Sequence, residues 1–285
     1  MLSTIIKLSV ATLLFSSCVK PVETVKNSHP AETFLNVAYG TDSKQKMDIY
    51  LPANRNADST GLIVAIHGGG WNEGDKADFT QYVKELQKLL PGYAFANINY
   101  RLFDLGTGGN KFPTQENDVK EAVNFLRSKS AEYGISKDFF LLGASAGAHL
   151  ALLHGYKHNT FGDIKAIISF FGPTDLVDFY KNYGDPRIPL LLFALTGTTP
   201  DQNEDVYVQS SPIHFVTAQS PPTLILHGGI DFVVPQGQSV LLKNKLEAAG
   251  VAHQYVYYPN EGHGWGGSNL VDSFNKIQAF ILKHQ

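Results

Sequence analysis

The sequence has one cysteine, Cys18, among 285 residues, which excludes any disulfide within the chain. It has no cluster of basic residues, and a net charge of -3 with neutral histidines gives no electrostatic basis for binding nucleic acid. Internal repeats and low-complexity blocks are absent. What remains is an ordinary globular composition, 43% hydrophobic and 17% charged, in a chain long enough for one large domain with a buried core.

The start of the chain has the pattern of a signal peptide over residues 1–18. Lys7 precedes an apolar run at 8–15 that is too short to cross a bilayer, and small residues then lead to Cys18. The stretch "LFSSC" resembles a bacterial lipobox, in which the cysteine is lipidated and becomes the new N-terminus, although phenylalanine stands where leucine is more usual. We therefore expect an exported protein. The expected form is a cell-envelope lipoprotein of the periplasm or outer membrane that contacts the membrane through its lipid alone, and a secreted protein is the alternative if the cysteine is incidental.

Residues 19–33 lack apolar periodicity and are predicted to be a tether, which leaves 34–285 as the catalytic domain. Within that domain, apolar runs alternate with segments of helical spacing. Strands are predicted at 34–39, 46–51, 62–67, 93–100, 138–142, 164–171, 222–228 and 253–258, and helices at about 78–90, 115–133, 146–156, 236–249 and 269–283. This alternation predicts an α/β fold with a mostly parallel sheet and helices on both of its faces.

The alternation breaks at residues 173–215, where four prolines surround the apolar stretch "IPLLLFAL". We interpret this segment as an insertion that forms a small cap or pocket wall above the sheet. The alternative is one more core helix with loops, and most of the apolar residues of the segment fit that interpretation.

The stretch "FFLLGASAGAHLALL", residues 139–153, interrupts an apolar run with small residues around one serine. A strand followed by Gly-x-Ser-x-Gly and a helix is the context of a nucleophile elbow, a sharp and strained turn that projects a serine hydroxyl above the sheet. A side chain at Gly143 or Gly147 would collide with the neighbouring strand and helix. Ser145 is therefore the predicted nucleophile.

A serine hydroxyl is a weak nucleophile that needs a base, and the base needs an acid to orient it. Asp231 in "LILHGGIDFVVP" and His263 in "YYPNEGHGW" follow Ser145 in the chain order expected for such an elbow. Both follow predicted strands, and sheets of this type place their sites at the carboxyl ends of strands. We predict His263 as the base and Asp231 as the acid, with Asp175 as the alternative acid.

The other histidines near these motifs have structural interpretations. Three of them lie on or beside the helix after the elbow and are predicted to be structural or exposed: His149, His154 and His158. His227 lies at a strand end and is expected to brace the loop that carries Asp231.

The glycine run in "HGGGW", residues 67–71, directly follows a predicted strand. Consecutive glycines let backbone N–H groups turn toward a ligand oxygen, and the oxygen of a tetrahedral intermediate carries negative charge. We assign the donors of this oxyanion hole to Gly69, Gly70 and Ala146, the residue after the nucleophile. A simple tight turn is the alternative, and the run lacks the patterns of phosphate-binding loops.

With these pieces in place, residues 34–285 resemble an α/β-hydrolase of the esterase/lipase superfamily. The resemblance rests on "HGGGWNEGDK", "NINYRL", "GASAGAHLALL", "SSPIHF", "PPTLILHGGIDFVVP" and "EGHGW". The pattern is most similar to bacterial esterases that remove acetyl or feruloyl groups from plant polysaccharides, and to kynurenine formamidases. The resemblance implies that Arg101 is structural, with its charge paired beneath the oxyanion loop.

Two tryptophans, Trp71 and Trp265, flank the predicted site in sequence. Either could bind substrate by stacking on a sugar or an aromatic acyl group, and packing that shapes the loops is the alternative. Asp75 and Lys76 are predicted to hold the loop after the glycine run.

The residues and the resemblance together predict a serine hydrolase that cleaves carboxylic esters through an acyl-enzyme. Its expected substrates are short-chain acyl esters of carbohydrates, acetyl or feruloyl. No metal or organic cofactor is expected, because no His, Asp or Glu cluster has ligand spacing. The alternatives are an arylformamidase, amidase or small peptidase of the same fold, and a non-catalytic binding protein. Such a binding protein would typically have lost one of the reactive residues that this sequence keeps.

Overall fold

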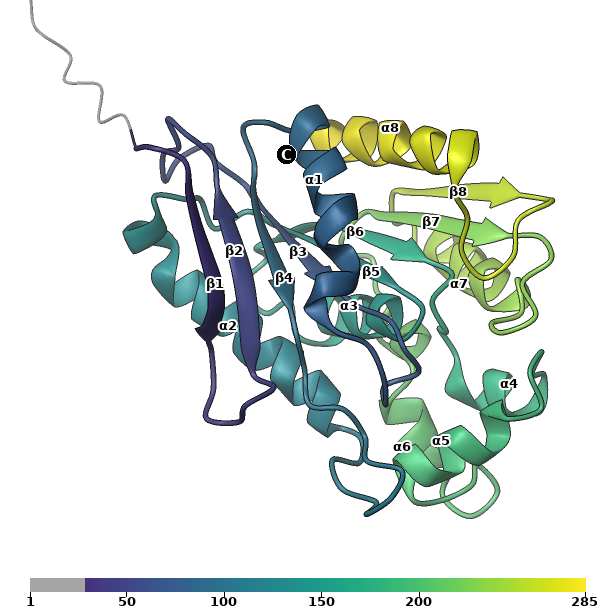
Figure 1. The fold of residues 1–285 in the computed structure, drawn as a ribbon. Coiled ribbons are helices and arrows are strands. Elements are labelled where there is room, and N and C mark those ends of the chain that lie inside the picture. The colour runs from purple at the N-terminus through teal and green to yellow at the C-terminus, as the bar shows by residue number, and fades with distance from the viewer. Residues whose placement is uncertain (1–28) are drawn as a thin grey trace, which may run out of the picture.

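The computed structural model describes residues 29–285 (Figure 1). The predicted signal peptide at 1–18, with Cys18, and the tether up to residue 28 lie outside the described residues. None of the described helices combines the length and the apolar character that crossing a membrane requires.

The described chain contains an eight-stranded sheet in the order β1-β2-β4-β3-β5-β6-β7-β8. The strands are β1 (Glu32–Ala38), β2 (Lys46–Leu51), β3 (Leu62–Ile66), β4 (Ala94–Ile98), β5 (Phe139–Ala144), β6 (Ile164–Phe170), β7 (Thr223–Gly228) and β8 (His253–Tyr258). β2 pairs antiparallel with β1 and β4, and all other neighbouring strands are parallel. The prediction of a mostly parallel sheet in an α/β-hydrolase fold is confirmed.

Helices cover both faces of this sheet, as predicted (Figure 1). They are η1 (Lys76–Phe79), α1 (Thr80–Leu89), α2 (Thr114–Tyr133), α3 (Ala146–Lys157), α4 (Leu176–Lys181), α5 (Ile188–Thr196), α6 (Glu204–Gln209), η2 (Pro212–Phe215), α7 (Gly237–Ala248) and α8 (Gly267–Lys283). α1 and α8 pack on one face, and α2, α3 and α7 pack on the other.

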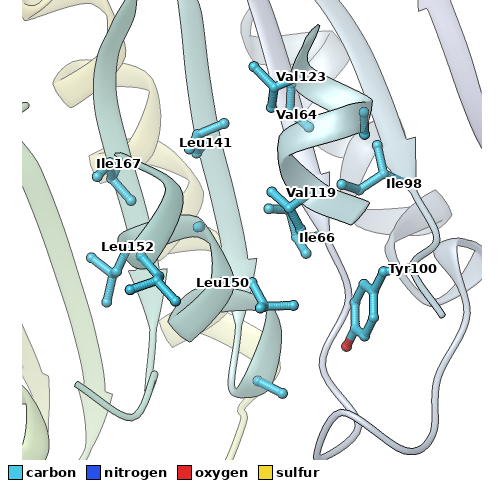
Figure 2. Packing of buried hydrophobic residues seen from close by; sticks show 14 of the residues in the cluster. Val64, Ile66, Ile98, Tyr100, Val119, Val123, Leu141, Leu150, Leu152 and Ile167 are labelled. Carbon is cyan, nitrogen blue, oxygen red and sulfur yellow. The ribbon is translucent and has the colours of Figure 1, made fainter. Parts of the chain in front are cut away.

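Strand β3 shows why the central strands have continuous apolar sequences. Val64 and Ile66 pack with Val119 of α2 in one core cluster (Figure 2), whereas Ile63 points to the other face and joins the cluster that contains Ile277 of α8. All five of these side chains are fully buried. Because helices cover both faces, a polar residue at any of these positions would be desolvated, so the strand does not alternate between apolar and polar residues.

The predicted insertion at 173–215 contains α4, α5, α6 and η2, which lie between β6 and β7 at the carboxyl edge of the sheet (Figure 1). Helix α5 buries Ile188, Leu192 and Leu195, whereas Leu190 is 71% exposed. We call these short helices the cap for their place at that edge, and one side of their apolar stretch packs into the core.

The predicted boundary between tether and domain at residue 34 is wrong by two residues. Glu32 and Thr33 already belong to β1, where they pair with Leu51 and Tyr50 of β2. Glu32 also forms an ion pair with Arg55. Because most side chains of this edge strand are exposed, hydropathy gives no sign of where it begins.

Arg101 is held by a buried carboxylate. Its Nε lies 2.9 Å and its backbone N–H 2.8 Å from Oδ2 of Asp118 on α2, and Gln45 donates to the same carboxylate. The Asp118 side chain is fully buried. A buried carboxylate is stable only when it is paired and hydrogen-bonded, so the segment after β4 is tied firmly to α2.

Candidate active site

The nucleophile elbow is a strained turn between β5 and α3. Ser145 has φ 54° and ψ -123°, a conformation that costs a non-glycine residue free energy. Its N–H donates to the carbonyl of Phe170 at 2.9 Å, and its carbonyl accepts the N–H of His149 at 3.0 Å. A Cβ atom at Gly143 would overlap the carbonyl of Gly147, and one at Gly147 would overlap the carbonyl of Ile66. Both glycines are therefore needed, because any side chain at these positions would prevent the close packing of β5 against α3 and of α3 against β3.

The side chains of Asp231, His263 and Ser145, which the sequence analysis predicts to act together, are connected by hydrogen bonds. His263 Nε2 lies 3.0 Å from Ser145 Oγ, and His263 Nδ1 lies 2.8 Å from Asp231 Oδ2. With the Nδ1 proton donated to the carboxylate, Nε2 is free to accept the hydroxyl proton of the serine. The residues come from the loops after β5, β7 and β8, which meet at the carboxyl edge of the sheet.

The carboxylate of Asp231 is oriented by the backbone of its own loop. Its Oδ1 accepts the N–H groups of Val233 at 2.8 Å and Val234 at 3.0 Å. The side chain is fully buried. With Oδ1 occupied in this way, Oδ2 is directed toward the imidazole.

His227 braces this loop, as the sequence predicts. Its Nε2 donates to the carbonyl of Val234 at 2.9 Å and lies 3.3 Å from Asp231 Oδ2, while Nδ1 contacts Ser239 Oγ at 2.6 Å. Burial by itself raises the pKa of Asp231, but the hydrogen bonds from His227 and His263 outweigh it and hold that pKa well below its ordinary value of 3.8. Asp231 is therefore ionised at neutral pH.

The alternative acid, Asp175, has a different role. It is the N-cap of α4, and its carboxylate accepts the N–H groups of Val177 at 3.0 Å and Asp178 at 3.1 Å. Its Oδ1 is thus engaged at the start of α4. The geometry favours Asp231 as the partner of His263.

The glycine loop after β3 presents free backbone donors. Gly69 and Gly70 have φ of +100° and +57°, and the carbonyl of Gly69 accepts the N–H groups of Asn72 and Glu73, which closes a tight turn. The N–H groups of both glycines donate to no atom of residues 29–285. Ala146 is the first residue of α3, where a backbone N–H has no partner within the helix. The N–H groups of all three predicted oxyanion donors thus have no hydrogen-bond partner among the described residues, and Gly69 and Gly70 line the same cavity as Ser145.

The loop after the glycine run is anchored on β2 and on the residue that follows β4. Lys76 Nζ lies 2.7 Å from Asp48 Oδ2, and both side chains are largely buried. Asp75 accepts the N–H of Ala77 at 3.0 Å and the side-chain amide of Asn99 at 2.8 Å. The loop-holding roles predicted for Asp75 and Lys76 agree with these contacts.

A cavity of about 690 Å³ opens at Ser145 and His263, between the glycine loop and the cap. The cap provides an apolar wall that includes Ile188, Leu191 and Ala194. The polar residues of the lining include Asn72, Glu73, Asp185 and Arg187. Sequence analysis predicted a pocket wall in 173–215 but did not identify its individual residues, because their contribution depends on how short helices fold back over the sheet.

Phe171 is a further residue that the sequence analysis missed. Its ring centroid lies 4.5 Å from that of His263, and the residue lines the cavity. It directly follows β6, at the same edge of the sheet as the other site residues. That position was the available signal, since the residues directly after parallel strands gather at this edge.

Comparison with known families decides the family of the chain. The model of the BD-FAE family matches residues 47–246, well over half of the sequence. This chain belongs to the BD-FAE family. The matched region contains Ser145, Asp231 and the glycine loop, and His263 lies beyond its end.

Relatives of this BD-FAE protein include esterases. Esterase LipC of Mycobacterium tuberculosis is 26% identical over 261 residues, which are 86% of this chain and 64% of LipC. A bifunctional GH43-CE protein of Bacteroides eggerthii has a similar structure, with a TM-score of 0.76 and 27% identity over 88% of this chain and 38% of that one. A truncated carbohydrate esterase from gut microbiota has a TM-score of 0.75 and 27% identity over 89% of this chain and 96% of that one. The chain spans less than two thirds of the length of the curated relatives it matches.

For Trp71 in this BD-FAE protein, the contacts support the packing alternative, although the residue also contributes to the lining of the cavity at Ser145. Trp71 is 2% exposed, and its indole N–H donates to Nδ1 of His149 at 3.2 Å. The two rings also meet edge to face, with centroids 5.2 Å apart. Trp71 has φ +62°, unusual for a bulky residue. Its indole therefore fixes the end of the glycine loop on the helix that follows the nucleophile.

His149 is structural, as predicted, and its protonation state is defined by its contacts. Its Nε2 lies 2.7 Å from the carbonyl of Ser210, to which it donates, while Nδ1 accepts from Trp71. Burial lowers the pKa of His149 to about 4, so the ring is neutral at pH 7. His154 is also buried, and His158 pairs with Glu116 at 2.6 Å.

Trp265, the second tryptophan, is partly buried. Its indole N–H donates to Ser273 Oγ at 2.9 Å. Its ring packs against Phe171 with centroids 5.5 Å apart. It lines a different cavity from the one that opens at Ser145.

Replacing Trp71 by phenylalanine should destabilise the protein. The variant keeps an aromatic ring but removes the donor to His149, which leaves Nδ1 unpaired in the core. We expect a loss of about 1–3 kcal/mol in the free energy of unfolding, measured by urea denaturation. Tyr183→Phe, at an exposed position, is the control. Equal unfolding free energies for the wild type and Trp71→Phe would contradict the role assigned to this hydrogen bond.

The lowered pKa of Asp231 predicts a pH dependence of stability. Because the pKa is lower in the folded than in the unfolded chain, the stabilisation is complete well above 3.8 and is lost as the pH falls below that value. Asp231→Asn removes this titration. On acidification from about pH 5 to about pH 3, the thermal unfolding midpoint should therefore fall more steeply for the wild type than for the variant. Parallel curves would show that the carboxylate is not stabilised in this way.

Proposed function

We propose that this protein is a serine hydrolase that cleaves carboxylic esters through an acyl-enzyme. The observation that carries the proposal is the row from Asp231 through His263 to Ser145, with contacts of 2.8 and 3.0 Å. The strained elbow and the free N–H groups of the glycine loop support the same chemistry. A binding protein of this fold would need neither the strain nor the row.

In the first half of the reaction, Ser145 Oγ attacks the carbonyl carbon of the ester and its proton passes to His263 Nε2. The ionised Asp231 stabilises the imidazolium that forms. The negative oxygen of the tetrahedral intermediate accepts hydrogen bonds from the N–H groups of Gly69, Gly70 and Ala146. When the bond to the alcohol oxygen breaks, His263 returns its proton to the departing alcohol, and the acyl group stays on Ser145.

In the second half, a water molecule takes the place of the alcohol. His263 Nε2 accepts a proton from the water as its oxygen attacks the acyl carbonyl, and the same backbone N–H groups stabilise the second oxyanion. Collapse of this intermediate breaks the bond to Ser145 Oγ, which recovers its proton from His263. The products are one carboxylic acid and one alcohol.

The substrates that we propose are acetyl or feruloyl esters of carbohydrates. The cavity at Ser145 combines an apolar wall with the polar side chains of Asn72, Glu73, Asp185 and Arg187, which suit a hydroxyl-rich alcohol. One structure of similar fold at 27% identity is named as a truncated carbohydrate esterase, and another at the same identity is named as a bifunctional GH43-CE protein. Both observations support a sugar as the alcohol.

The test is acetate release from acetylated xylan, with 4-nitrophenyl acetate as a small ester for comparison. We expect Ser145→Ala and His263→Ala to lower the turnover of both substrates by about 10⁶-fold, and Asp231→Asn by about 10⁴-fold, because the base then loses its orienting partner. Asp175→Asn is the matched control and should keep nearly wild-type turnover.

The outcomes separate chemistry from substrate. Wild-type rates in Ser145→Ala would overturn the acyl-enzyme mechanism. Cleavage of the small ester alone would support the mechanism but not acetylated xylan as a substrate, and feruloyl esters and N-formylkynurenine would be tried next.

We also propose that the protein is exported and anchored in the cell envelope through lipidated Cys18, on the sequence pattern of residues 1–18. In a bacterial host, the full chain should fractionate with membranes and incorporate labelled fatty acid. The Cys18→Ser variant should lose both properties. Unchanged fractionation of this variant without any label in the wild type would overturn the anchor.

A further inference from the structure

Two aromatic side chains stay exposed where the cap meets the loop that carries Asp231. Tyr183, between α4 and α5, is 45% exposed, and Phe232, which directly follows Asp231, is 76% exposed. Neither of them lines the cavity at Ser145. Exposed apolar surface that gathers beside a cavity is typical of binding surfaces, so this pair is a candidate for contact with a ligand.

Gly184 brings the two aromatic residues together. A Cβ atom at Gly184 would lie 2.4 Å from the carbonyl oxygen of Phe232 and 3.4 Å from its Cα atom. Tyr183 is the adjacent residue in the chain, so its Cα atom is only about 3.8 Å from that of Gly184. The two aromatic side chains therefore leave neighbouring points of the backbone, one from the cap and one from the loop after β7.

The surface that carries these two residues is continuous with the cavity at Ser145. Asp185, two residues after Tyr183, lines that cavity, and so does Val233, which directly follows Phe232. A ligand that extends out of the cavity on this side would therefore meet the two aromatic residues next.

Arg187 adds hydrogen-bond donors to the same segment of the cap. Its Nε lies 3.0 Å from both carboxylate oxygens of Asp185, which orients the guanidinium, and its side chain is 86% exposed. Its Nη1 donates to no atom of residues 29–285. Because Asp185 balances the charge of Arg187 and Glu73 also lines the cavity, an anionic ligand would gain no net attraction. The free N–H groups suit the oxygens of a neutral ligand.

Sugar rings match this combination of groups. A pyranose ring has C–H groups on its faces and hydroxyl groups around its edge. The C–H groups are slightly positive and pack well on the negative face of an aromatic ring, and the hydroxyl oxygens accept hydrogen bonds from a guanidinium. A single sugar bound in the cavity would leave Tyr183 and Phe232 uncovered, because they lie outside it. A longer chain would reach both the nucleophile and the aromatic pair.

We propose that Tyr183, Phe232 and Arg187 form an outer subsite for the sugar units next to the esterified one. The protein then prefers esterified oligosaccharides and polysaccharides to esters of single sugars. This inference rests on the proposed hydrolysis of carbohydrate esters, and it adds the length of the substrate chain and the direction in which that chain leaves the cavity. Binding of these remote units helps to hold the ester at Ser145.

The test places the same acyl group on two lengths of chain, acetylated xylohexaose and acetylated methyl xyloside, with 4-nitrophenyl acetate as an ester without sugar. The wild type should have a kcat/KM about tenfold or more higher for the hexaose than for the xyloside. Tyr183→Ala and Phe232→Ala should each raise KM for the hexaose about fivefold with little change in kcat, because the lost contact is remote from the reacting bond. Both should keep the wild-type kcat/KM for the two smaller esters.

Two further variants separate stacking from structural effects. Tyr183→Phe keeps the aromatic ring and should keep the wild-type KM for the hexaose. Phe161→Ala removes a ring that is 71% exposed just before β6, at the opposite edge of the sheet, and should leave the kinetics of all three esters unchanged.

The results distinguish the outer subsite from the proposed function. If the wild type does not prefer the hexaose, or if both alanine variants keep its KM or lower the turnover of all three esters equally, the outer subsite is wrong and ester hydrolysis stands. Cleavage of 4-nitrophenyl acetate alone overturns the subsite together with the carbohydrate substrate. If no ester is cleaved, the proposed function itself fails. Thermal unfolding identifies an alanine variant that has not folded, and the variant on the other loop then decides.

Discussion

The site depends on backbone packed against backbone, because a Cβ atom at Gly147, at the start of α3, would overlap the carbonyl oxygens of Ile66, at the end of β3, and of His67, which follows it. This contact allows the helix to leave Ser145 at a sharp angle. It also places the glycine loop, which continues from β3, directly beside the nucleophile. A methyl group at Gly147 would force these segments apart, and the distance between the serine and its oxyanion donors would increase with them.

On both sides of that contact, the groups of the site are held in fixed positions by hydrogen bonds. Asp231 is oriented by the N–H groups of Val233 and Val234 and by His227, so the imidazole of His263 meets a carboxylate that is already fixed and ionised. On the opposite side, Trp71 fixes the end of the glycine loop. Preorganised groups of this kind favour a charged intermediate because they need no rearrangement when the charge develops.

The sequence was sufficient to predict the parallel sheet, the elbow and the residues that meet there, because each rests on a local pattern. Apolar runs identify buried strands, the Gly-x-Ser-x-Gly context identifies the turn, and chain order identifies Asp231 and His263. The cap walls and the start of β1 could not be predicted as well. Leu190 faces solvent and Leu192 the core within one apolar stretch, and β1 pairs through its backbone while its side chains stay exposed.

The sequence left the role of Trp71 open for a related physical reason. An aromatic residue beside an oxyanion loop can face either the ligand or the core, and sequence spacing does not distinguish the two. Here the orientation of the indole depends on His149, a residue 78 positions away whose buried Nδ1 accepts the indole N–H. Contacts of this kind appear only when the fold brings the two segments together.

The carbonyl of Ser210, between α6 and η2 of the cap, accepts the one ring N–H of His149, on Nε2. The cap is thereby connected through one imidazole and one indole to the loop that would stabilise the oxyanion. Because these hydrogen bonds connect the cap to the glycine loop, a change in the position of the cap would also shift the glycine loop. Exchange of caps between related enzymes would therefore alter the rate of the chemical step together with the choice of substrate, unless Ser210 keeps its place.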